Sequence, residues 1–438
     1  MKKSFLLTFL FFPIFLIHSQ NYNRFIESQY KKQTYLESSN ELSQNYVFIG
    51  LYKLALMEEE KDDHIYNYVF SPQLANIKST NAYPYIYKAI KTNKIVILNE
   101  AHNIPLNRVM LYTIIDSFAK FHVDGLFIEA LPYTQNDSIS HKKSPLEDGG
   151  FFIGESTFRQ VMFKLKSANI PVYSYEILFN DLDTATFQGK KYIVSKKDST
   201  WTPILADEYI LSFFLSKEDE ASREAEQALK IYQKMKRNKI QKAVVFCGYG
   251  HSWRQEGSMI TILEYLLKEK VFSIEQTLLN ERVNKKLEDP VYSKFATNNV
   301  PFVVVDSLGN PVHRACMDDY SVCSDKWVDM VIGSPKTVYV HNRPTWLELN
   351  GDRKRYKLND FVDVSPYTDF LVAIYNKNEL TKVKKEYTPD DVFQVLDNTT
   401  NYDLILSPNK EYQLVIIKDG KTLISKTINT NEHIKGNN

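Results

Sequence analysis

Cysteine is scarce in this chain, and so is any excess of charge of one sign. Three cysteines in 438 residues are too few for a disulfide framework. The 54 lysines and arginines nearly balance the 53 aspartates and glutamates, leaving a net charge of +1. The chain as a whole therefore lacks the basic character that favours nucleic acid. We expect no nucleic-acid partner, so that ligand recognition must depend on local groups.

The positions of the three cysteines leave two alternatives open. Cys316 and Cys323 stand in "CMDDYSVC" and either close a short loop in an oxidising compartment or stay reduced. Cys247 lies in an apolar run, which predicts a buried free thiol. A structural zinc site is disfavoured, because two thiols without a second pair lack the usual four ligands.

Apolar runs long enough to cross a membrane are also missing, since a spanning helix needs about 20 apolar residues. The first twenty residues, "MKKSFLLTFLFFPIFLIHSQ", combine two lysines, a shorter apolar run and a small, polar end. This layout is typical of a secretory signal peptide (1–20), with cleavage near Ser19 or Gln20. No cysteine follows the apolar run, so no lipid anchor is expected there. The sequence predicts a secreted or periplasmic protein that does not span a membrane.

Residues 21–90 are expected to form a helical lead-in. From 91 to 282, short β-branched runs alternate with longer amphipathic segments. Strands separated by helices of ten or more residues imply βαβ crossovers. We therefore predict an α/β core with a mostly parallel sheet flanked by helices. Its strands are expected at 94–100, 124–130, 170–176, 242–250 and 271–276.

The alternation stops after residue 282. We expect a linker region over 283–339, followed by a C-terminal all-β, sandwich-like module over 340–438. Period-two patterning and the hairpin signal "KDGK" support the β module. Nothing in the module indicates catalysis or the nature of a partner.

Polar side chains follow each of the five predicted core strands. Ligands of open parallel sheets bind outside the carboxyl ends of the strands, so these residues form a set. One interpretation is that strand ends are simply where chains become polar; the other is a site in which a carboxylate and an imidazole orient and activate water. The strand-end residues are Glu100 with His102, Glu129, Glu176, His251 in "GYGH", and Glu275 with Gln276.

Arg223, in "ASREAEQALK", has two interpretations as well. It can stabilise negative charge that develops on a substrate oxygen, or it can pair with Asp219, four residues earlier, on a solvated helix face. The known G-x-S-x-G, P-loop, G-x-G-x-x-G, HxH and HExxH signatures are absent, although two histidines and several glutamates could also bind a divalent metal. The remaining histidines after the leader are expected to be incidental: His64, His122, His141, His313, His341 and His433.

Four motifs occur in a familiar order: "VILNEAHNIPLNR", "GLFIEAL", "SREAEQA" and "VVFCGYGH". Over roughly residues 94–277 the chain resembles the superfamily containing erythromycin esterase-like hydrolases, ChaN-type haem-binding lipoproteins and Tiki/TraB-type proteins. The resemblance to the esterase branch implies catalytic roles for Glu100, His102, Glu129, Arg223 and His251. We further expect Asn103, Glu176, Glu226 and Tyr249 to contribute to substrate binding.

The motifs also depart from the esterase branch. That branch usually has Gly before the Glu, whereas Asn99 stands here, and the two-residue step from Glu100 to His102 is more similar to the ChaN and Tiki branches. The leading hypothesis is an exported hydrolase that uses an activated water on an ester, lactone or amide of a small molecule or peptide. The alternative is a ChaN-type protein that binds haem or another ligand without turnover, and the Tiki resemblance would imply a divalent metal. A third interpretation is a degenerate core that carries a docking module.

Overall fold

The computed structural model describes residues 39–61, 77–131, 151–176, 181–216, 219–297, 300–312, 315–316, 323–324, 326–380, 388–396 and 401–431. The predicted signal peptide lies outside these residues. Among the described helices, none combines the length and apolar character needed to cross a membrane.

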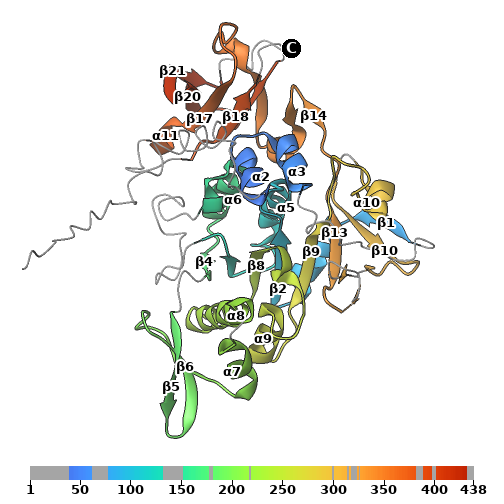
Figure 1. The fold of residues 1–438 in the computed structure, drawn as a ribbon, viewed down its shortest axis with the longest axis vertical. Helices are drawn as coiled ribbons and strands as arrows, with labels where there is room; N and C mark the ends of the chain where they lie inside the picture. Colours follow the sequence, from blue (N-terminus) through green and yellow to red (C-terminus); the bar gives the residue numbers. More distant parts are fainter. Residues whose placement is uncertain are drawn as a thin grey trace, which may run out of the picture.

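An eight-stranded sheet forms the centre of the molecule, and its order is β1-β10-β13-β9-β2-β8-β3-β4 (Figure 1). The six strands from β13 to β4 pair in parallel, whereas β10 is antiparallel to both β1 and β13. With its flanking helices this sheet confirms the α/β class. The strands are β1 (Lys78–Asn81), β2 (Ile95–Glu100), β3 (Gly125–Ile128), β4 (Val172–Ser174), β8 (Ala243–Gly248), β9 (Phe272–Leu279), β10 (Phe302–Val305) and β13 (Met330–Gly333).

Strand β2 shows why these runs are apolar at every position. All six of its residues are buried. Val96 and Leu98 pack into one hydrophobic cluster, while Ile95 and Ile97 pack into a second cluster on the opposite face. Successive strand side chains point to opposite faces, so a strand covered on both sides must be apolar throughout.

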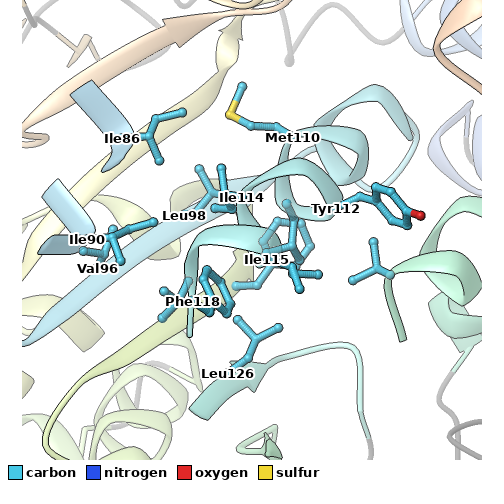
Figure 2. Close-up of a cluster of buried hydrophobic side chains, with 14 of the residues drawn as sticks. Ile86, Ile90, Val96, Leu98, Met110, Tyr112, Ile114, Ile115, Phe118 and Leu126 are labelled. Atoms are coloured by element: carbon cyan, nitrogen blue, oxygen red, sulfur yellow. The ribbon is translucent and has the colours of Figure 1, made fainter. Parts of the chain in front are cut away.

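Helices cover both faces of the sheet. The first cluster receives α4 (Tyr83–Thr92), α5 (Leu106–Ile114) and α6 (Ser156–Ser167), and Figure 2 shows side chains of α4 and α5 meeting those of β2 and β3. The second cluster receives α7 (Glu208–Phe214), α8 (Asp219–Arg237) and α9 (Met259–Leu267).

Three strands that the sequence did not predict lie between β4 and α7. They are β5 (Leu182–Phe187), β6 (Lys190–Ser195) and β7 (Ile204–Leu205), and they form a separate antiparallel sheet. In Figure 1 the β5–β6 hairpin projects away from the core beside α7 and α8. The segment from residue 203 to 239 is amphipathic and reads as one long helix, but in the structure it is divided into β7, α7 and α8.

The expected linker region (283–339) is wrong for two of its segments, because β10 and β13 are strands of the central sheet. The lead-in (21–90) likewise contains β1, the edge strand. The prediction depended on βαβ alternation. Strands β1 and β10 pair antiparallel and need no crossover helix, and β13, although parallel to β9, follows β10 with no described helix between them. This part of the sheet packs against α10 (Pro290–Phe295) through its own hydrophobic cluster.

Two N-terminal helices, α2 (Ser39–Phe48) and α3 (Tyr52–Glu59), pack between the core and the C-terminal strands (Figure 1). Gly50 separates them with a φ of +70°. A Cβ at this position would lie 2.6 Å from the carbonyl oxygen of Val392, so Gly50 permits both the turn and the close contact with the C-terminal region.

The C-terminal region consists of small antiparallel sheets, as expected of its period-two pattern. A four-stranded sheet (β18-β17-β20-β21) and a two-stranded sheet (β16-β19) share one hydrophobic cluster. The strands are β14 (Tyr339–Val340), β15 (Arg343–Pro344), β16 (Lys354–Lys357), β17 (Phe370–Asn376), β18 (Asp391–Val395), β19 (Asp403–Leu406), β20 (Glu411–Lys418) and β21 (Lys421–Asn429); the short helix α11 is Lys377–Leu380.

The cysteine predictions have different outcomes. Cys247 is a buried free thiol, as expected. The short strands β11 (Ala315–Cys316) and β12 (Cys323–Ser324) pair so that Cys316 is opposite Cys323. The side chains of both residues lie outside the described part of the chain, so the bridge stays a prediction.

Candidate functional site

The carboxyl ends of β2, β8, β3 and β4 lie side by side in the sheet. The chain reaches β8 only after β3 and β4, and then inserts it between β2 and β3. Such a reversal of strand order is where open α/β sheets place their ligand crevice. Four predicted residues are brought to this edge by their strands: Glu100, Glu129, Glu176 and His251.

The first half of the site is built on Glu100, which is 2% exposed. Arg108 of α5 donates from Nε to its Oε2 at 2.7 Å and from Nη2 to its Oε1 at 3.1 Å. Arg108 also donates from Nη1 to Oε2 of Glu155 at 3.0 Å. Burial by itself would raise the pKa of Glu100, but Arg108 and His102 more than offset burial, and the pKa is lowered. Glu100 is therefore an ionised, fully bonded carboxylate.

His102 is oriented by this carboxylate. Its Nδ1 lies 2.9 Å from Oε1 of Glu100, so Nδ1 carries a proton and, in the neutral ring, Nε2 has a free lone pair. The ring stacks on Phe152 with the centroids 4.1 Å apart. Its side chain remains 19% exposed, so the site presents an imidazole of fixed orientation to solvent.

The second half of the site is centred on Arg223, in the first turns of α8. Its Nη2 donates to Oε1 of Glu129 at 2.7 Å and to Oε2 of Glu176 at 2.7 Å, and its Nε donates to Oε1 of Glu176 at 3.2 Å. Gln227, one turn along, also donates to Oε2 of Glu176 at 2.9 Å. The solvated-face interpretation of Arg223 is thus wrong, although 42% of its side chain is still exposed.

His251 lies between two carboxylates. Its Nε2 is 3.3 Å from Oε1 of Glu129, and its Nδ1 bonds Oε1 of Glu224. Burial alone would lower the pKa of His251, but Glu129 and Glu224 raise it to about 10. Conversely, burial would raise the pKa of Glu129, but His251 and Arg223 hold it well below its ordinary value. Two cations, Arg223 and the His251 imidazolium, therefore share Glu129.

Gly248 joins the two halves. Its N–H donates to Oε2 of Glu129 at 2.5 Å. A Cβ on this residue would lie 2.9 Å from Nε2 of His102 and 3.4 Å from Oε2 of Glu129. Because Gly248 has no side chain, Nε2 of His102 can lie close to the carboxylate of Glu129, which binds Arg223 and His251. The two halves therefore form one continuous polar site.

Not every predicted residue contributes to this site. Burial raises the pKa of Glu226, Lys230 lowers it and Asp181 raises it further. These neighbours are not residues of the site, so Glu226 lies on a different face of α8. Asn103 is buried and donates to Oγ of Ser43 at 3.1 Å, while its Oδ1 accepts from the Tyr249 hydroxyl at 2.9 Å. Substrate-binding roles for Glu226 and Asn103 are therefore not supported, because neighbouring residues enclose both side chains.

Glu275, from the fifth strand end, is also enclosed. It is 0% exposed and accepts hydrogen bonds from Asn99 at 2.6 Å and from the Trp253 indole at 2.6 Å. Burial raises the pKa of Glu275. Its described partners are neutral donors, so it fastens β9 to β2 rather than facing the site.

Sequence reasoning missed three residues of the site: Arg108, Glu155 and Glu224. Arg108 ends the quoted motif "VILNEAHNIPLNR", and Glu224 directly follows Arg223. An arginine eight residues after the strand-end carboxylate, in the first turn of the next helix, was the available signal. Glu155 had no such signal, because it is 47 residues from Arg108 in the sequence. It also caps α6, where its side chain accepts from the N–H groups of Thr157 and Phe158.

Within the described residues, no group of three or more His, Cys, Asp or Glu side chains has the arrangement of a metal site. The carboxylates of the site already accept hydrogen bonds from arginine or histidine. The Tyr249 hydroxyl, a candidate haem ligand, is bonded to Asn103. Of the histidines expected to be incidental, His341 pairs with Asp403 at 2.9 Å and His122 lies on a turn outside the site; the other four, His64, His141, His313 and His433, lie outside the described residues.

Comparison of the chain with models of known protein families, with curated protein sequences and with solved structures found no match.

Proposed function

We propose that this protein is an exported hydrolase in which His102 is the general base that activates a water molecule. The observation that carries the proposal is the Glu100–His102 pair. Nδ1 is bound to a buried carboxylate, and Nε2, beside Gly248, has no hydrogen-bond partner among the described residues. An imidazole held in one tautomer by a carboxylate is a common arrangement for general-base catalysis.

His102 is better suited to this role than Glu100. Both oxygens of Glu100 accept hydrogen bonds from Arg108, and its lowered pKa makes it a weak base. Glu100 is therefore a positioning residue. Arg108 holds Glu100 in place, and Glu155 in turn holds Arg108.

The reaction that fits these groups begins when Nε2 of His102 takes a proton from water. The water oxygen adds to the carbonyl carbon of an ester, lactone or amide, and the carbonyl oxygen becomes an oxyanion. Arg223 and the His251 imidazolium, both beside Glu129, supply positive charge for it. When the intermediate collapses, the leaving alkoxide or amine takes the proton from His102, which restores the neutral imidazole.

The ordered motifs support the same proposal through their resemblance to the erythromycin esterase-like, ChaN and Tiki superfamily. The substrate class stays broad, since Asn99 replaces the usual Gly of the esterase branch. ChaN-type haem binding is less well supported, because the Tyr249 hydroxyl is committed to Asn103 at 2.9 Å. Mixing the purified protein with haemin tests that alternative: a shifted haem absorption band would favour it over turnover.

His102→Ala tests the proposed base. We expect the rate constant kcat for a substrate found by screening esters, lactones and peptides to fall at least about 100-fold, because general-base catalysis contributes about 10²–10⁴-fold. Glu100→Gln should lower kcat and change its pH profile, because a neutral amide replaces the charged acceptor that binds both His102 and Arg108.

The chain offers a matched control in His341→Ala. His341 also lies 2.9 Å from a carboxylate, that of Asp403, but in the C-terminal region. The His341→Ala variant should leave kcat unchanged. If His102→Ala and His341→Ala had equal activities while both remained folded, the proposed role of His102 would be wrong.

A further inference from the structure

A cavity of about 230 Å³ lies apart from the candidate site, where the core meets the segment that leads to the C-terminal strands. The start of α5 forms one wall, and residues 334–336 and 345–351 form another. None of the nine predicted site residues lines this cavity. It is therefore a concave feature that the proposed hydrolysis does not use.

The walls of the cavity combine apolar and aromatic surface. Leu106, Val109 and Met110 come from α5, and the rings of Tyr83 and Trp346 are also among the lining residues. The volume suits a single ring or a short branched chain, since drug-sized ligands occupy about 300–1,000 Å³.

One cation in the wall lacks a counter-charge within the described part of the chain. Lys336 lines the cavity and is half-buried, and its ammonium group makes no ion pair with any described residue. The carboxylate of Glu348, also in the wall, is already bound by Nε of Arg355 at 2.6 Å. The indole N–H of Trp346 likewise has no acceptor among the described residues. The cavity thus offers an ammonium group and an indole donor beside apolar surface. Its other polar groups include the Arg355-bound carboxylate of Glu348 and Oε1 of Gln276, which has no hydrogen-bond partner among the described residues.

We propose that this cavity binds a small carboxylate with an apolar ring or branched body. The carboxylate pairs with Lys336, which is favourable because charge-assisted hydrogen bonds are roughly twice as strong as neutral ones. The ring packs among Leu106, Met110 and Trp346. Binding of the carboxylate does not require the proposed hydrolysis.

The cavity also has a structural connection to the candidate site. Asn107 lines it, and its Oδ1 accepts from the N–H of Ala101 at 3.0 Å, between Glu100 and His102. Gln276 lines it too, and its N–H donates to Oδ1 of Asn99 at 2.8 Å. A bound carboxylate would therefore lie against the residues that hold the segment after β2.

Binding of 4-fluorobenzoate to the full chain, followed by ¹⁹F NMR titration, tests the proposal. We expect saturable binding, a dissociation constant at least about tenfold higher for Lys336→Met, and weaker binding of the neutral probe 4-fluorobenzamide. A tenfold change corresponds to about 1.4 kcal/mol. Lys91→Met, which removes an exposed lysine of α4, is the matched control and should bind like the wild type.

A second variant, Val109→Phe, fills the cavity from α5 and should abolish binding while Lys336 stays in place. Circular dichroism of each variant checks that the fold is retained. Equal affinity of the wild type and Lys336→Met for 4-fluorobenzoate, or no binding to the wild type at millimolar probe, would overturn the proposal. Because no step depends on turnover, either result is separate from the outcome for His102.

Discussion

At the scale of single residues, Gly248 is the position where the site depends most on an absent side chain. The backbone of β8 brings it between His102 and Glu129, with no room for a Cβ near Nε2 of His102. Its φ is −77°, so backbone strain is not the reason for glycine here. The reason is close approach of two functional groups.

Gly248→Ala should therefore displace His102 while the protein still folds. We expect a cost of about 1–3 kcal/mol in the free energy of unfolding from overpacking, measured by urea denaturation. Gly248→Ala should also lower kcat for hydrolysis, because the added Cβ displaces His102. Gly250→Ala is the control, since a Cβ there meets nothing within 4 Å; similar losses in the two variants would contradict the explanation.

At the scale of elements, His251 connects the turn after β8 to two helices. It bonds Glu224 of α8, whose other oxygen accepts from the N–H of Met259 at 2.6 Å, at the start of α9. The protonated ring is therefore part of the structure as well as part of the site.

This connection predicts a pH dependence of stability. The pKa of His251 rises from an ordinary value near 6.5 to about 10 on folding, so the folded state binds the proton more tightly than the unfolded state. The stabilisation is fully present below about pH 6.5 and is lost as the pH rises toward 10. Denaturation at pH 6, 8 and 10 should show a decline in the wild type that is smaller in His251→Gln. Parallel curves for the two proteins would exclude the effect.

Elements also show where sequence patterns stop being informative. The alternation of strands and helices from β2 to β9 was predictable, because each buried strand is apolar at every position and each helix has one apolar face. Strand β10 was missed because an antiparallel strand needs no crossover helix. Strand β13 is parallel to β9, but β10 and not a long helix precedes it among the described elements, so the alternation was not visible. On α8, Arg223 and Gln227 face the site while Glu226 does not, a division that follows from helical spacing once Arg223 is placed.

At the scale of the whole molecule, the C-terminal strands are joined to the core by a buried ion pair. Nη1 of Arg159, on α6, lies 2.5 Å from Oδ1 of Asp390, and the two side chains are 1% and 12% exposed. The α6 helix also begins at Glu155, which bonds Arg108 of the site. The core and the C-terminal region should therefore unfold together.

Arg159→Met tests this coupling. Leaving Asp390 without its partner should cost about 3 kcal/mol or more in the free energy of unfolding, as for other broken buried pairs. A double-mutant cycle with Asp390→Asn isolates the pair. Lys196→Met, which removes a half-exposed ion pair with Asp183, should change stability little. Two separate transitions in the wild type would show that the regions are not coupled.

The sequence by itself determined which residues are apolar enough to form the strands from β2 to β9 of the core, which of these strands end in carboxylates or imidazoles, and that the C-terminal region is built of β pairs. Local patterns carry that information because burial and periodicity are properties of neighbouring residues. Only the tertiary structure decided that Arg223 bonds Glu129 and Glu176, that Glu226 and Asn103 are enclosed elsewhere, and that Arg108 neutralises Glu100. These contacts join segments far apart in the chain, and strand order, which no local pattern encodes, brings them together.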